Sequence, residues 1–197
     1  MAYELDDFCE DCKDLIDPAT GKKDLDAVRN NLEKLCQNQE FVDATCGPDA
    51  KAGVHTLYRD ADKDFMVLSH INAESRTSPP HDHGASWAIY CQAVEYTEMT
   101  EYDRTDDSSV QGHAELEVTK KYRLDPGNAG YFDSHCIHSI HFPAGARFIR
   151  VTGTDLTKLT TKKFSMDEQS VTVVTPNDKA GAACSAAAFS AAACSAS

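Results

Sequence analysis

The segment Ser78–Tyr90, "SPPHDHGASWAIY", holds two histidines, His81 and His83, one residue apart and directly behind a Pro-Pro pair. Side chains two positions apart on an extended strand point to the same side, so both imidazoles can reach a single ion. Imidazole nitrogen is a common ligand of transition metals in proteins. The spacing therefore predicts two ligands of a metal site, and a third ligand must come from elsewhere in the chain.

A second histidine cluster, in the segment "DSHCIHSIHF", offers that third ligand. His135 falls in a predicted turn. His138 and His141 fall on a predicted strand, and because their positions differ by an odd number, they point to opposite faces. Strand alternation alone leaves His138 and His141 as alternatives for the third position.

Length, charge and hydropathy limit the classes of protein to which the chain can belong. The chain has 197 residues, which favours one domain, and a formal net charge of -13 argues against a nucleic-acid partner. The sequence holds no apolar run of about 18 residues, so no membrane association is expected. Because the start of the sequence lacks the pattern of a secretory signal, we expect a cytoplasmic protein with reduced thiols.

Two of the eight cysteines, Cys9 and Cys12, form a CxxC pair that is compatible with redox chemistry or zinc binding. The apolar residues around them, such as Phe8 and Leu15, recur at helical spacing and place both thiols on the same buried stripe. No second cysteine pair follows at zinc-site spacing. We therefore predict that both are buried structural thiols.

The apolar pattern of the chain changes from a helical period to a strand period near residue 50. Residues 1–50 are predicted to form a helical segment packed on a barrel, with helices at 3–16, from about Asp24 to Cys36, and at 39–44. From Gly53 the apolar period becomes two, and short strands alternate with Gly, Pro and Asp turns.

This second pattern predicts an all-β sandwich or barrel over residues 51–175. Within it, "SWAIYCQAVEYTEMTEYDR" reads as one long strand or two continuous ones. The last segment, 176–197, is rich in Ala, Ser and Cys, and is predicted to be a disordered or weakly helical tail.

Taken with this pattern, the histidines make the chain resemble the cupin superfamily. His81 and His83 fit the His-x-His pair of the first cupin motif, and the interval from Gly127 to His138 fits the second motif. The resemblance implies a double-stranded β-helix, or jelly-roll barrel, and it favours His138 as the third ligand.

The first cupin motif also carries a glutamate ligand, which would fall here at Trp87 or Ala88 and is absent. The resemblance thus implies a three-histidine site. Among three-histidine cupins the chain is similar to the cysteine dioxygenase group, in its N-terminal helices and in the segments "LYRD", "DFMVLSHINAESRTSPPHDHGASW" and "GYFDSHCIHSI".

In that group an arginine ahead of the histidine pair binds the substrate carboxylate, and Arg59 occupies the matching place. The Ser-His-Tyr set of the family corresponds here to Phe148, Arg150 and Thr152. The cysteine of the thioether crosslink known in some members would fall near Ala88, so that crosslink cannot form.

The resemblance implies a mononuclear non-haem iron(II) (Fe2+) dioxygenase that oxidises a small thiol to a sulfinate, with Arg59 and Arg150 in catalytic roles. His55 is expected to share a face with Arg59 and to assist it. Substrate-binding residues are expected at Arg59, Tyr58, Trp87, Tyr90 and Phe148.

Three other functions fit the same histidines. One is a cupin that cleaves a carbon–carbon bond with O2, another is a non-redox metal-dependent isomerase or lyase, and the last is a binding module without catalysis. The expected partners are a small-molecule substrate and O2, and the chain is expected to be a monomer or a homodimer.

Overall fold

The computed structural model describes residues 2–179, so most of the predicted Ala/Ser/Cys tail lies outside the described residues. Three helices come first, as predicted, and a small β-hairpin separates the first two. Their bounds are α1 (Leu5–Leu15), β1 (Ile16–Asp17), β2 (Lys22–Lys23), α2 (Leu25–Cys36) and α3 (Gln39–Cys46).

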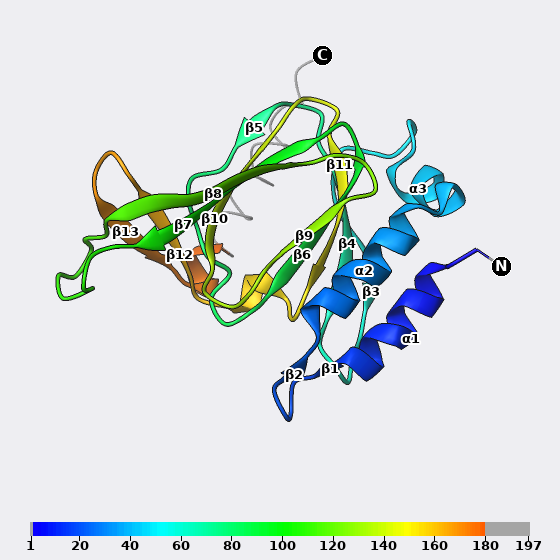
Figure 1. Cartoon of the computed structure of the whole chain (residues 1–197), viewed down its shortest axis with the longest axis horizontal. Helices are drawn as coiled ribbons and strands as arrows, with labels where there is room; N and C mark the ends of the chain where they lie inside the picture. The colour runs from blue at the N-terminus through cyan, green and yellow to red at the C-terminus, as the bar shows by residue number, and fades with distance from the viewer. Residues whose placement is uncertain (1, 180–197) are drawn as a thin grey trace, which may run out of the picture.

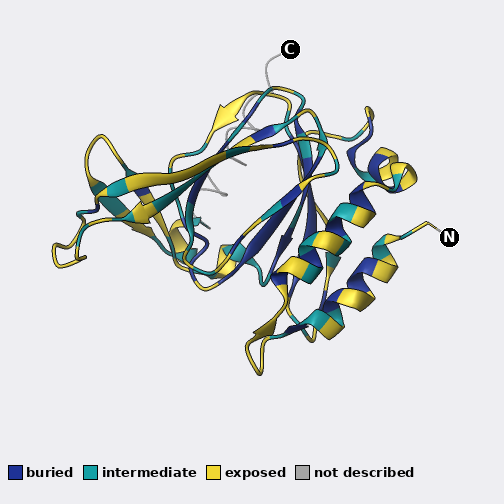
Figure 2. Cartoon of the chain, in the orientation of Figure 1, coloured by how far each residue is buried: buried dark blue, intermediate teal, exposed yellow. Residues whose placement is uncertain are grey.

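Polar residues mark where the helices begin. The carboxylate of Asp24 accepts a hydrogen bond from the backbone N–H of Ala27 at 3.0 Å, and Asn38 caps α3 in the same way through Glu40 at 3.1 Å. Such caps satisfy N–H groups that a helix leaves without partners in its first turn. Each helix buries one side and exposes the other (Figure 2), so the helices must lie against a further layer.

That layer is the larger of two antiparallel sheets. The five-stranded sheet has the order β3-β4-β11-β6-β9, the four-stranded sheet has the order β5-β10-β7-β8, and β12 and β13 form a hairpin. The strands are β3 (Gly53–Arg59), β4 (Met66–Ile71), β5 (Arg76–Thr77), β6 (Ala88–Val94), β7 (Thr97–Arg104), β8 (Leu116–Leu124), β9 (Ala129–Phe132), β10 (Ile137–Phe142), β11 (Arg147–Thr152), β12 (Thr161–Ser165) and β13 (Ser170–Val174).

The five-stranded sheet separates two apolar cores. The helices cover its outer face, while its inner face looks toward the four-stranded sheet (Figure 1). Ile89 and Ile149 point outward into the helix-side core, and their neighbours Tyr90 and Phe148 point inward. This alternation follows from the period of two in a strand. The chain is therefore an antiparallel jelly-roll sandwich with N-terminal helices, as the sequence predicts.

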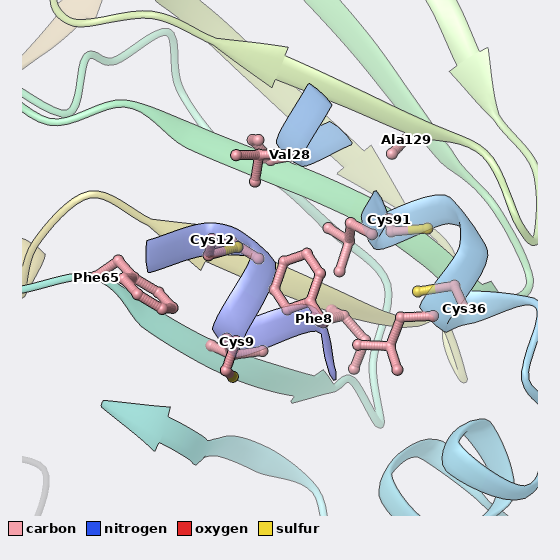
Figure 3. Close-up of a cluster of buried hydrophobic side chains, with 14 of the residues drawn as sticks. Phe8, Cys9, Cys12, Val28, Cys36, Phe65, Cys91 and Ala129 are labelled. Carbon is pink, nitrogen blue, oxygen red and sulfur yellow. The ribbon is translucent and has the colours of Figure 1, made fainter. Parts of the chain in front are cut away.

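The CxxC pair lies in the helix-side core, as predicted. Cys9 and Cys12 are buried beside Phe8, between α1 and the sheet (Figure 3). Burial raises the pKa of the Cys9 thiol to about 12, so the thiol stays protonated. A protonated, buried thiol is neither a nucleophile nor a metal ligand.

The strands differ from the prediction in two places. The stretch predicted as continuous is two strands in different sheets, because the chain turns at Glu95, whose φ is 60°. The strand β12 was not predicted at all, since its Lys-rich sequence lacks apolar alternation. Within residues 2–179, no helix is long and apolar enough to cross a membrane.

Candidate metal centre

Three histidines meet on the inner side of the sandwich. The ligand atoms of His81, His83 and His138 all lie within 4.8 Å of one another. The ring centroids of His81 and His83 are 4.6 Å and 4.7 Å from that of His138, and 5.3 Å from each other. The histidine pair and the distant single histidine therefore form one group that can hold a metal ion.

The main chain brings the two histidine segments together. The N–H of His81 donates to the carbonyl of His138 at 2.9 Å, and the N–H of His138 donates back at 3.0 Å. On its other side the histidine segment meets β12, where the N–H of Phe164 donates to the carbonyl of Pro80 at 2.8 Å. The segment is thus held between β10 and β12.

Asp82, between the two histidines, anchors the turn that presents them. Its side chain is buried, and its carboxylate accepts hydrogen bonds from the N–H groups of Gly84 at 3.0 Å and Lys162 at 2.8 Å. Gly84 has a φ of 61°, and a Cβ there would collide with the backbone oxygen of Thr160. Only glycine fits this turn.

Backbone carbonyls orient two of the imidazoles. Nδ1 of His81 lies 3.0 Å from the carbonyl oxygen of Pro79, and Nδ1 of His138 lies 3.3 Å from that of Cys136. A carbonyl can only accept, so each Nδ1 carries the proton and each Nε2 keeps its lone pair. Nε2 of His138 is buried and has no hydrogen-bond partner among the described residues. A buried lone pair of this kind fits a metal ion.

Burial also keeps the three imidazoles neutral. It lowers the pKa of His138 to about 3 and that of His83 well below 6.5, and it lowers the pKa of His81 as well. Positive charge on the neighbouring imidazoles would add to this effect. Neutral imidazoles bind a metal without first losing a proton.

The structure separates the rival histidines. His138 joins the group, whereas His141 lies on the other face of β10, where its Nδ1 is 2.8 Å from the hydroxyl of Thr77. His135 sits in the preceding turn with a φ of 63°, and its N–H donates to the carbonyl of Gly84. Strand alternation left His138 and His141 as alternatives. The cupin-like spacing from Gly127 to His138 favoured His138, which is the histidine that joins the group.

Two aromatic rings enclose the group. The ring of Phe132 stacks on that of His138, with centroids 3.7 Å apart and 5° between the planes. The hydroxyl of Tyr90 lies 3.3 Å from Nε2 of His83, and burial raises the pKa of that phenol. Tyr90 is among the residues expected near the substrate. Phe132 was missed, because its face becomes clear only once β9 is known to pair with β6.

Arg150 faces the same interior. It lies directly opposite Tyr90 in the register of β11 and β6, and its inward neighbours on β11 are Phe148 and Thr152. Its Nε is buried without a partner, and it forms no salt bridge within residues 2–179. After burial and the two neighbouring imidazoles, its positive charge also lowers the pKa of His83. Arg150 is therefore a cation beside the three histidines.

Arg59 lies at the rim of the same face. It is opposite Met66 in the register of β3 and β4, and its guanidinium pairs with Asp155 at 2.5 Å. The side chain is 42% exposed. A β-bulge in β3 places His55 opposite Ser69, on the other face from Arg59. The expected shared face of His55 and Arg59 is therefore wrong, because the bulge reverses the alternation between them.

Tyr58 and Trp87 lie on the opposite side of the sheet from the histidines. The hydroxyl of Tyr58 donates to Asp60 at 2.8 Å, and both aromatic rings pack in the helix-side core. The signal for this was present in the sequence. Tyr58 adjoins Arg59, and Trp87 is an odd number of residues from Tyr90, so neither pair can share a face of a regular strand.

No known protein-family model matches the chain, and no curated protein sequence matches it either. Among solved structures, similarity is found to KdgF from Halomonas sp., with 16% identity and a TM-score of 0.37, over 50% of this chain and 74% of that one. A cupin superfamily protein from Desulfitobacterium hafniense DCB-2 has 14% identity and a TM-score of 0.38, over 54% and 84%.

The DMSP lyase DddQ from Ruegeria pomeroyi DSS-3 has 12% identity and a TM-score of 0.35, and the match covers 51% of this chain but only 44% of DddQ. By its own strand order and its layers, the chain is an antiparallel jelly-roll sandwich with a three-histidine group on its inner side.

Proposed function

We propose that this protein is a mononuclear iron(II) dioxygenase that oxidises a small thiol to a sulfinate. The observation that carries the proposal is the ligand group itself, three neutral imidazoles without a carboxylate. The reaction is R–SH + O2 → R–SO2⁻ + H⁺. Sulfur gains both oxygen atoms and loses four electrons, O2 accepts those four electrons, and the thiol proton is released, so no further reductant is needed.

His81, His83 and His138 would hold the ion. When bound, iron(II) on three neutral ligands supplies redox chemistry for O2 and a positive charge that favours the thiolate form of a neighbouring thiol. The backbone carbonyls of Pro79 and Cys136 keep the rings of His81 and His138 oriented, because each accepts a hydrogen bond from Nδ1.

Tyr90 and Arg150 supply polar groups on the same inner face as the histidines. The raised pKa of Tyr90 keeps its hydroxyl protonated, so the phenol can donate a hydrogen bond to a group held beside His83. The guanidinium of Arg150 supplies fixed positive charge on the same inner face. Both groups are in place before a substrate arrives, which reduces reorganisation during the reaction.

Metal analysis of the purified protein, combined with O2-uptake measurements on a panel of small thiols and a matched panel of β-diketones, tests the proposal. We expect iron and thiol-dependent O2 uptake, with a sulfinate as product. O2 uptake with diketones and not with thiols would support carbon–carbon bond cleavage instead. Full turnover without O2 would assign a non-redox isomerase or lyase, and a protein that binds neither iron nor thiol would end the proposal.

A further inference from the structure

The stack of Phe132 on His138 is unusually close. The two ring centroids are 3.7 Å apart, and the planes differ by 5°. Because the carbons of stacked rings meet at about 3.5 Å, this centroid distance leaves little lateral offset. Aromatic pairs prefer an offset stack or a T-shaped contact, with centroids about 4.5–7 Å apart. The two rings therefore lie nearly face to face, in an arrangement that uncharged rings disfavour.

Two other ring contacts on the inner face follow the usual preference. His70 also stacks on a phenylalanine, Phe148, but their centroids are 4.6 Å apart, so that stack is offset. Tyr90 meets Phe132 in a T-shaped contact, at 5.8 Å and 71°. His138 belongs to the three-histidine group, and His70 does not. Of these two stacked histidines, the one in the face-to-face contact is thus the one that can bind a metal.

The chain holds the His138 ring on one edge and on one face. The carbonyl oxygen of Cys136 lies 3.3 Å from its Nδ1, and Phe132 covers its face. Phe132 is itself fixed by strand pairing, opposite Ala88 in the register of β6 and β9. Both stacked side chains are buried, and Nε2 of His138 has no hydrogen-bond partner among the described residues. The contact is therefore in place before an ion binds.

A bound ion changes what this contact contributes. An imidazole that gives its lone pair to a metal ion becomes electron-poor and takes up part of the positive charge. The face of a phenyl ring carries negative potential and attracts positive charge placed above it. The stack is thus unfavourable for an uncharged imidazole and favourable for a metal-bound one, and it improves as the charge on the ion rises. Because both rings are buried, water screens this attraction little.

We propose that Phe132 is a positioning residue of the metal centre, which acts through His138 to favour the metal-bound imidazole and to favour iron(III) over iron(II). A ring that stabilises the more highly charged ion lowers the reduction potential of the Fe3+/Fe2+ couple. A lower potential makes iron(II) a better electron donor to O2. The inference rests on the proposed function only for the identity of the ion, since the effect on metal affinity holds for any divalent ion at the three histidines.

Phe132→Leu removes the aromatic face and keeps an apolar side chain. In metal-free protein titrated with zinc(II), we expect the affinity to fall about 3- to 30-fold, the range for a cation–π contact away from water. In iron-loaded protein, a redox titration should give a higher Fe3+/Fe2+ potential. Each tenfold loss in the affinity for iron(III) relative to iron(II) corresponds to about 59 mV for one electron.

Replacement of Phe132 by pentafluorophenylalanine separates charge from shape. The fluorinated ring fills similar space, but its face carries positive potential. We expect it to raise the Fe3+/Fe2+ potential and to weaken zinc binding at least as much as Phe132→Leu does. A merely structural role would leave both quantities close to those of the wild type in the fluorinated protein.

Phe142→Leu is the matched control. Phe142 is buried in the same inner core, where its ring meets Phe148, and it stacks on no histidine within residues 2–179. This variant should lose stability but keep the wild-type zinc affinity and potential. Circular dichroism establishes that each variant is folded. Equal shifts in Phe132→Leu and Phe142→Leu, or unchanged values in the fluorinated protein, overturn the proposal.

The same measurements separate this inference from the proposed function. If zinc affinity depends on the face of Phe132 but no thiol drives O2 uptake, the dioxygenase function fails and the role of Phe132 stands. If thiols are oxidised while neither zinc affinity nor the Fe3+/Fe2+ potential responds to the fluorinated ring, the function stands and the role of Phe132 fails.

Discussion

His81 and His138 exchange both hydrogen bonds of an antiparallel backbone pair, at 2.9 Å and 3.0 Å. Two of the three imidazoles are therefore positioned by main-chain bonds between residues far apart in the sequence. Main-chain bonds do not depend on the side chain, so one imidazole can be removed while the backbone pair remains.

The first prediction follows from this pair. His138→Ala should leave a folded protein whose metal affinity falls by at least about 100-fold, because loss of a ligand exceeds the loss of roughly 10- to 100-fold seen for outer partners. His141→Ala is the matched control, since His141 lies on the other face of β10. Metal content per chain, measured with circular dichroism, checks both. Metal loss in His141→Ala with retention in His138→Ala would reassign the third ligand.

Asp82→Ala should damage both stability and metal retention. The substitution leaves the N–H groups of Gly84 and Lys162 without their acceptor. The loss of the acceptor for one buried and one part-buried donor costs about 2–4 kcal/mol in the free energy of unfolding. Urea denaturation of the metal-free protein measures this, and a competition titration with a chelator measures metal affinity. A loss of stability with unchanged metal affinity would show that Asp82 does not position the histidines.

His70 should make the stability of the protein depend on pH. Burial, and next the positive charge of Arg150, lower its pKa well below 6.5, so the folded protein keeps this imidazole neutral. The unfolded chain takes up the proton as the pH falls below about 6.5, so acid favours unfolding from there down to the folded pKa.

The comparison with His70→Phe isolates this effect. Between about pH 7.5 and pH 5, the wild type should lose up to about 2 kcal/mol more unfolding free energy than the variant, which is the limit for a histidine that stays neutral. Urea denaturation of both metal-free proteins at the two pH values measures the difference. Parallel losses in the two proteins would mean that His70 is protonated in the folded state.

The CxxC pair should be irrelevant to the metal. Cys9→Ala and Cys12→Ala each remove a buried sulfur from the helix-side core, and each should cost about 1–3 kcal/mol of stability. Neither should change iron content or O2 uptake per folded chain. A fall in iron content in a variant that remains folded would show that the thiols take part in metal handling.

Local patterns were sufficient for much of this protein. Apolar residues such as Val28, Leu32 and Leu35 recur at helical spacing, and all are buried in α2. The alternation of two brought His81 and His83 to one side, and the same rule separated His138 from His141. Each of these inferences needs only the geometry of one element.

Pairing between elements was harder to predict. The bulge in β3 places His55 and Arg59 on opposite faces of the sheet. No residue type in that strand indicates a bulge. Thr161–Ser165 pairs against the histidine segment although its Lys-rich sequence does not look like a strand. Such features depend on contacts between distant segments, and a local sequence pattern does not contain that information.

The docking of β12 against the histidine segment has a consequence for folding kinetics. The three histidines meet only when β10 has paired with the segment that carries His81 and His83, and β12 packs on the other side of that segment. Contacts of such long range form slowly, so a nascent chain passes through a stage in which the ion has no complete site. An ion that binds only the paired form stabilises it by mass action, so metal uptake after dilution from denaturant reports when the two histidine segments have paired.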